Sequence, residues 1–127
     1  MKLRTLFMIN FFIALFFGLG CAIFAVPLIQ LYGLAANEAA IWTTRLVGGS
    51  ILGFSALMWF GANTASAEAR RVIAFALFVQ DIVGLVASME IQLGGNINVL
   101  GWSNPILYLL LALGYGYFAF IAKEENR

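Results

Sequence analysis

Hydrophobic side chains fill four long stretches of the chain, and polar side chains are largely confined to the short segments between them. Residues 5–37 contain no charged side chain, and three further runs of comparable apolar character follow. Each run is close to the ~20 residues that a helix needs to cross a hydrocarbon core. The pattern predicts an all-α integral membrane bundle of four transmembrane helices, at about residues 6–31, 41–60, 70–92 and 104–122.

Proline, glycine and small polar residues indicate where these helices begin and end. Pro27 lies late in the first predicted helix and favours a kink or an early ending, and Gly33 favours a stop. Thr64 or Ser66 is expected to cap the third helix at the end of a short turn. Because that turn is short, the second and third helices are expected to be antiparallel neighbours. The fourth helix is expected to start near Asn104.

The composition agrees with a membrane solvent and with one domain. Hydrophobic residues make up 63% of the chain and charged residues only 10%, against ~25% in soluble proteins. Four spans leave loops too short for a second core, so residues 1–127 are predicted to form a single transmembrane domain. The lipid bilayer is its expected partner. A net charge of +1 and no dense basic patch indicate no binding of nucleic acid.

The inventory of reactive side chains excludes several kinds of site. The chain has no histidine, which excludes His-ligated haem or zinc and any catalytic triad that uses imidazole. Its single cysteine, Cys21, cannot form an intrachain disulfide or a C-x-x-C redox pair. We therefore expect no catalytic residue, no metal site and no enzymatic activity.

Basic residues predict the orientation of the protein in the membrane. All but one of the Lys and Arg side chains fall on one side of the predicted spans, and the two connections on the other side carry none. The positive-inside rule then places both termini in the cytoplasm and the protein in the cell membrane as a multi-pass protein. The residues concerned are Lys2, Arg4, Arg70, Arg71, Lys123 and Arg127.

Small residues on the second predicted helix suggest where helices approach each other closely. Gly49 and Gly53 are four residues apart and form a small-xxx-small pair. In lipid, such pairs allow close contact between backbones, which holds helices together. We expect this helix to be the central packing element. The alternative is that the glycine pair forms the seam of a homo-oligomer.

Three ionisable residues lie within or at the edge of the predicted spans, where charge is costly. Asp81 lies about 15 Å along the third helix from Arg71, near the middle of the membrane, whereas Glu90 lies near its boundary. Arg45 is about one turn inside the second helix, so its depth favours Glu90 as its partner, with Asp81 as the alternative. Such an ion pair would fix the register of the two helices.

Asp81 shares a helical face with Gly84, Ser88 and Gln92, which predicts a polar stripe directed toward the interior of the bundle. One interpretation is a buried, hydrogen-bonded carboxyl group that specifies packing. The other is the floor of a polar pocket that binds a proton, a cation or a small headgroup. Potential hydrogen-bond partners of Asp81 are Asn10, Ser55 and Tyr108. The candidate intramembrane site thus comprises Arg45, Asp81, Ser88, Glu90 and Gln92.

Three segments of small and apolar residues resemble the DoxX-like bacterial membrane proteins and the uncharacterised families related to them. These segments are residues 27–33 (PLIQLYG), 45–53 (RLVGGSILG) and 100–103 (LGWS). The resemblance spans most of the chain and implies a four-span protein of the bacterial inner membrane. It also implies an association with quinone-linked sulfur oxidation or with redox partners at the membrane. Without a redox-active cysteine pair, the implied role is contact with a quinone or anchoring.

These observations predict an accessory or structural membrane protein that catalyses no reaction. Its expected architecture is a left-handed bundle of antiparallel helices, and its partner besides lipid is a second copy or another membrane protein. Two alternatives remain open. One is a DoxX-like, quinone-associated accessory protein, with quinone as its cofactor, and the other is a small protein for proton or solute permeation.

Overall fold

A computed structural model describes residues 2–122, and these residues form helices joined by short turns, with no strand among them. The predicted all-α class is confirmed. In chain order the elements are α1 (Leu3–Ile23), α2 (Ala25–Leu31), α3 (Glu38–Asn63), α4 (Ala67–Leu93), the short 3-10 helix η1 (Val99–Trp102), α5 (Ser103–Gly116) and the π-helical turn η2 (Tyr117–Ile121).

Four helical stretches are long and apolar enough to cross a bilayer. They are α1, α3, α4 and the continuous stretch Val99–Ile121, which η1, α5 and η2 form together. The most apolar 18-residue window of each has a mean hydropathy between 1.3 and 2.4. The four predicted spans are therefore confirmed, and the chain is a multi-pass membrane protein.

The first predicted span is divided in two, as Pro27 suggested. The helix breaks at Phe24, whose φ of −111° and ψ of 41° are not helical, and α2 then runs from Ala25 to Leu31. Pro27 cannot donate a hydrogen bond to the carbonyl of Ile23, and its ring would clash with that carbonyl in a continuous helix. The break therefore precedes the proline by one turn.

Side-chain caps define the starts of the two longest helices. The side chain of Asn37 accepts a hydrogen bond from the backbone N–H of Ala40 at 2.8 Å, and that of Ser66 accepts one from Ala69 at 3.1 Å. The Ser66 cap is one of the two that the sequence predicted. Because the Asn37 side chain satisfies a backbone N–H of the first turn, α3 begins at Glu38, before the apolar run of residues 41–60. It also continues past that run, to Asn63.

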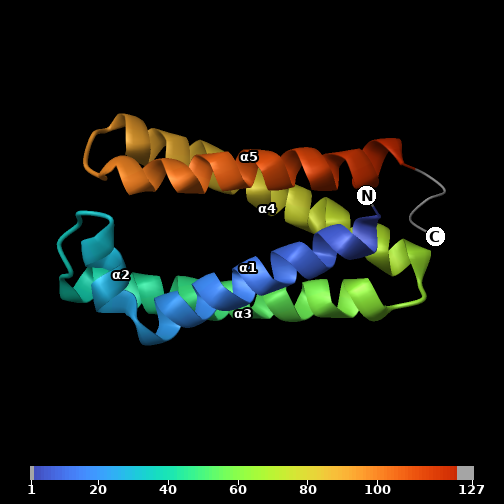
Figure 1. The fold of residues 1–127 in the computed structure, drawn as a ribbon, viewed down its shortest axis with the longest axis horizontal. Coiled ribbons are helices and arrows are strands. Elements are labelled where there is room, and N and C mark those ends of the chain that lie inside the picture. Colours follow the sequence, from blue (N-terminus) through green and yellow to red (C-terminus); the bar gives the residue numbers. More distant parts are fainter. Residues whose placement is uncertain (1, 123–127) are drawn as a thin grey trace.

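The spanning helices are arranged as two pairs. Figure 1 shows α1 lying along α3 and α4 lying along α5, and most contacts between helices are made within these pairs. The short turn at residues 64–66 connects α3 to α4. These two helices nevertheless contact each other far less than α3 contacts α1 or α4 contacts α5. The two pairs diverge toward the end of the molecule that carries α2 (Figure 1).

The hydrophobic core joins the two pairs at only one end of the molecule. This end, called the terminal end, contains the start of α1, the turn between α3 and α4, and η2 (Figure 1). Phe7 of α1, Leu77 of α4 and Tyr115 of α5 are almost completely buried there. Arg71 Nε donates a hydrogen bond to the carbonyl of Ala119 at 3.3 Å, which connects α4 to η2. The buried members of the core are Leu3, Leu6, Phe7, Ala14, Met58, Ala62, Ile73, Ala74, Leu77, Leu111, Tyr115 and Phe118.

The opposite end, called the α2 end, is connected by hydrogen bonds. Asn98 Nδ2 donates to the carbonyl of Leu31 at 2.8 Å, and the backbone N–H of Asn98 donates to that of Tyr32 at 3.2 Å. Gly33 permits this approach, since it has a φ of +78° and lies against the Asn98 side chain. Asn98 thus links the loop after α2 to the loop after α4.

The close contact between α1 and α3 is made by Gly48, the neighbour of the predicted glycine pair. A Cβ atom at Gly48 would lie 2.6 Å from the backbone N of Ala22 and 2.9 Å from the carbonyl O of Gly18. A Cβ atom at Gly49 or Gly53 would meet nothing within 4 Å. The structure therefore does not use Gly49 and Gly53 for packing within the chain. This helix packs mainly on α1, through a face about 100° away from the expected one, and is not the central element of the bundle.

Candidate functional site

Between the two helix pairs lies a cleft with two adjacent chambers. The deep chamber, of about 80 Å³, is lined mainly by α1, α3, α4 and α5 and includes Asp81. The wide chamber, of about 380 Å³, lies toward the α2 end and includes Ser88. The two chambers share four lining residues, so they adjoin each other: Phe17, Ile51, Asn104 and Tyr108.

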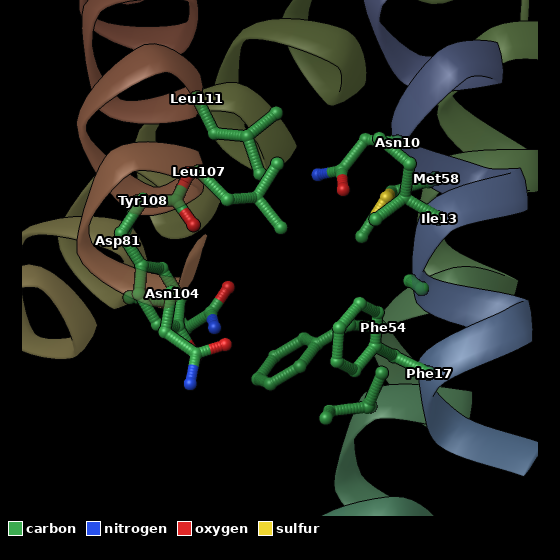
Figure 2. A pocket seen from close by; sticks show the side chains of 13 residues that line it. Asn10, Ile13, Phe17, Phe54, Met58, Asp81, Asn104, Leu107, Tyr108 and Leu111 are labelled. Carbon is green, nitrogen blue, oxygen red and sulfur yellow. The ribbon is translucent and has the colours of Figure 1, made fainter. Parts of the chain in front are cut away.

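The two walls of the deep chamber differ in chemistry. Figure 2 shows Asp81, Asn104 and Tyr108 on the wall formed by α4 and α5. Phe17 and Phe54 lie on the opposite wall, formed by α1 and α3 (Figure 2). One wall therefore presents polar groups, whereas the other presents aromatic rings and aliphatic side chains.

Asp81 is an almost completely buried acidic side chain in the lining of the deep chamber. Only 1% of its surface is exposed, and its Oδ2 atom has no hydrogen-bond partner. It lies near the middle of the 27-residue helix α4, and therefore near the middle of the membrane. Buried carboxyl groups are normally hydrogen-bonded or paired, because leaving them unpaired costs free energy. The first interpretation of Asp81, as a hydrogen-bonded packing residue, is therefore not what the structure shows.

Other polar side chains around Asp81 also lack protein partners. Among residues 2–122, the half-buried side chains of Gln80, Asn104 and Tyr108 form no hydrogen bond. Asn10, on the opposite wall, donates from Nδ2 to the hydroxyl of Tyr115 at 2.9 Å, which leaves its amide oxygen without a partner among the described residues. The floor of the cleft thus offers both donors and acceptors to a ligand.

The floor of the deep chamber rests on the hydrophobic core. Ala14, Met58 and Leu111 line the chamber and also belong to the core at the terminal end. The core residues Phe7 and Tyr115 contact each other with tilted rings whose centroids are 5.8 Å apart. The cleft therefore ends at mid-depth instead of continuing through the protein.

The structure separates the predicted site residues into two groups. Asp81 and Ser88 line the cleft, as the polar stripe on α4 suggested. Arg45 and Glu90 are exposed, line neither chamber, and form no ion pair with each other or with Asp81 among the described residues. The expected ion pair of Arg45 is thus not formed.

Gln92 is buried where α4 meets η1, outside the lining of both chambers. Its Nε2 atom donates to the carbonyl of Asn98 at 3.4 Å, and its Oε1 atom has no partner. It packs against Gly101, where the absence of a side chain makes room for it. Gln92 therefore stabilises the loop after α4, in which Asn98 makes the hydrogen bonds to the loop after α2.

None of the three expected hydrogen-bond partners of Asp81 forms a hydrogen bond with it. Ser55 donates its hydroxyl to the carbonyl of Leu52 at 2.7 Å, and Asn10 bonds to Tyr115. Tyr108 lines the cleft and covers Gly84, without a hydrogen bond to Asp81. A side chain at position 84 would collide with the Tyr108 ring, so Gly84 brings α5 close to α4 beside the site.

The sequence interpretation missed Gln80 and the aromatic wall. Gln80 directly precedes Asp81 on α4, so its amide was a detectable polar signal in an otherwise apolar segment. Phe17 and Phe54 carried no such signal, because the chain has 12 phenylalanines and nothing in the sequence distinguishes these two. Only the arrangement of the helix pairs identifies these two rings as cleft residues.

Among residues 2–122 no group of three or more His, Cys, Asp or Glu side chains is placed to hold a metal ion. Comparison of the chain with protein-family models, curated proteins and solved structures gives no match. The functional assignment therefore comes from the cleft and its chemistry.

Proposed function

We propose that this protein binds a small amphipathic molecule in the cleft between its helix pairs and acts as a non-catalytic accessory protein of the membrane. The observation that carries the proposal is the unpaired, buried Asp81 at the end of an otherwise mainly apolar cleft. A ligand group that hydrogen-bonds there would satisfy polar atoms that the protein leaves without partners. The wide chamber, of about 380 Å³, is within the size range of small-molecule sites.

The closed terminal end favours binding over free permeation. A channel requires a continuous polar path, but the path from Asp81 toward the terminal end is occupied by the core residues Leu77, Phe7 and Tyr115. The cleft is therefore a pocket with a floor in this conformation.

We also propose that the terminal end faces the cytoplasm. Lys2 and Arg4 lie at the start of α1, and Arg70 and Arg71 lie near the start of α4, so all four are at this end, as the positive-inside rule requires. Lys123 and Arg127, which contributed to the same prediction, lie outside the described residues. In this orientation the wide chamber belongs to the outer half of the membrane, and the cell membrane is the proposed location.

A photoreactive alcohol tests binding without assuming the identity of the natural ligand. We expect a diazirine-labelled octanol to label cleft residues of the detergent-solubilised protein saturably, with adducts located by mass spectrometry. Ala87→Phe should reduce this labelling, because position 87 lines the wide chamber and a phenyl group would fill it. Val86→Phe is the matched control, since Val86 is 63% exposed on the outer surface of the same helix. Non-saturable labelling spread over the lipid-facing surface would contradict the proposal.

Quinone is a second candidate ligand, which the resemblance to DoxX-like proteins implies. The amide groups of Gln80 and Asn104 line the deep chamber and could donate hydrogen bonds to quinone carbonyl oxygens, and the aromatic wall could contact the ring. On this reading decylubiquinone competes with the photoreactive alcohol for the cleft. Labelling that remains unchanged at saturating decylubiquinone would remove quinone as a ligand.

A further inference from the structure

We propose that the preferred ligand is a hydrophobic cation, such as an alkyl or aryl amine, whose charged head lies against Asp81. This inference rests on the proposed binding function and specifies the chemical class of the ligand. The head would occupy the deep chamber, and its apolar tail would extend into the wide chamber toward the α2 end.

The distribution of charge in the cleft supports a cationic head. Among residues 2–122, Asp81 is the only Asp, Glu, Lys or Arg side chain that lines either chamber. Arg45, the basic residue of α3, is exposed and lines neither chamber. No basic side chain of the lining can therefore neutralise an ionised Asp81. A ligand cation can do so, whereas an anionic head would meet a carboxyl group and no positive charge.

The surroundings of Asp81 also suit a cation. Phe17 and Phe54 face the polar wall across the deep chamber, and the faces of aromatic rings attract cations. The side-chain oxygen of Asn10 is a further acceptor on that side, because only its Nδ2 atom is engaged, in the bond to Tyr115. Carboxylate, amide oxygen and aromatic ring together form an electron-rich environment.

The dimensions of the two chambers indicate how the ligand is oriented. The deep chamber, of about 80 Å³, has room for a small head, whereas the wide chamber, of about 380 Å³, has room for a tail. Side chains of the wide chamber are mostly apolar, and Leu28, Val47 and Ile91 are examples. A long-chain or aryl amine fits this division better than a small hydrated metal cation, which would leave the apolar chamber unused.

Two ligands of the same shape test the role of charge. The probes are trimethyl(4-phenylbutyl)ammonium and its neutral isostere, in which carbon replaces the quaternary nitrogen, with binding measured by competition against the photoreactive alcohol. We expect Asp81→Asn to weaken binding of the cation at least tenfold and to leave binding of the isostere unchanged. Glu90→Gln removes the same charge from an exposed position on α4 and should alter neither.

The pH dependence of binding by the unmodified protein gives a second test that requires no variant. A proton and the cation compete for the Asp81 carboxylate, so affinity for the cation should fall as pH is lowered, approaching tenfold per pH unit. The titratable groups that face Asp81 are Tyr108 and Tyr115 of α5, while the elements α1 and α3 contribute none to the deep chamber. Tyrosine ordinarily titrates near pH 10, so neither accounts for a change between pH 5 and 8.

The possible outcomes separate this inference from the proposed function. If the isostere binds in the cleft and the cation binds no better, or if cation affinity is independent of pH, the cation proposal is wrong but the binding function stands. An equal loss of cation affinity in Asp81→Asn and Glu90→Gln also overturns it. If neither probe nor the photoreactive alcohol binds saturably, both proposals fail.

Discussion

Replacing Gly48 with alanine should destabilise the folded protein by about 1–3 kcal/mol, the usual cost of overpacking a filled interface. The new Cβ atom would lie 2.6 Å from the Ala22 backbone N and 2.9 Å from the Gly18 carbonyl O, and backbone atoms cannot rotate away. Helices α1 and α3 would therefore have to separate. The effect is measurable as a lower midpoint of unfolding of the detergent-solubilised protein on addition of sodium dodecyl sulfate.

Gly49→Ala is the matched control for this substitution. A Cβ atom at position 49 meets nothing within 4 Å, and alanine favours a helix over glycine by up to ~1 kcal/mol. The control should therefore leave the midpoint unchanged or raise it slightly. If Gly48→Ala and Gly49→Ala shift the midpoint equally, the contact between α1 and α3 does not run through Gly48.

Asp81→Leu should stabilise the protein by about 1–3 kcal/mol, which is the cost of burying a polar group without a hydrogen bond. Asp81 is 1% exposed and its Oδ2 atom has no partner, so leucine removes this cost, and the adjoining chamber has room for the larger side chain. The same change should abolish binding of the cationic probe. A residue retained at a cost in stability is typical of a functional site.

Asp81→Asn separates the effect of side-chain polarity on stability from the effect of side-chain size. Asparagine is close to aspartate in volume and still places polar atoms in the cleft, so we expect a smaller gain in stability than with leucine. Unfolding in sodium dodecyl sulfate measures both variants. If Asp81→Leu unfolds more readily than the unmodified protein, Asp81 makes a stabilising contact in the fold, and the packing interpretation is the better one.

Much of the fold could be predicted from the sequence because hydrophobicity and capping are local properties. The four spans follow from runs of apolar residues that only lipid can accommodate. The Ser66 cap and the break before Pro27 depend on a few neighbouring atoms, and the structure confirms both. Asp81 was recognisable as an interior residue because charge in a span must avoid lipid.

The arrangement of the helices could not be predicted in the same way. Rotating α3 by about 100° about its axis would bring Gly49 instead of Gly48 against α1. The sequence does not distinguish these two arrangements, because both residues are glycine. The position of Arg45 along α3 suggested a partner at similar depth, but depth alone does not bring two side chains to the same side of a bundle. In the structure α3 pairs with α1, and Arg45 is exposed and lines neither chamber of the cleft.

The division into two pairs is the feature from which the candidate site arises. Each pair is tightly packed, at Gly48 in one and at Gly84 in the other, while the hydrophobic core joins them only at the terminal end. Toward the α2 end the pairs diverge and are connected by Asn98. The polar face of α4 therefore borders a cleft. In a compact four-helix bundle, a neighbouring helix would cover this face.

Cysteine labelling in detergent micelles tests most directly whether this cleft is open. In a Cys21→Ala background, a cysteine at Leu107 would face the deep chamber, whereas one at the neighbouring Ile106, which is 57% exposed, would face detergent. A small water-soluble thiol reagent should react much faster at position 107, and the ammonium probe should slow that reaction without affecting position 106. Equally slow reaction at both positions would show that a sealed helix interface surrounds Asp81, and would contradict the account.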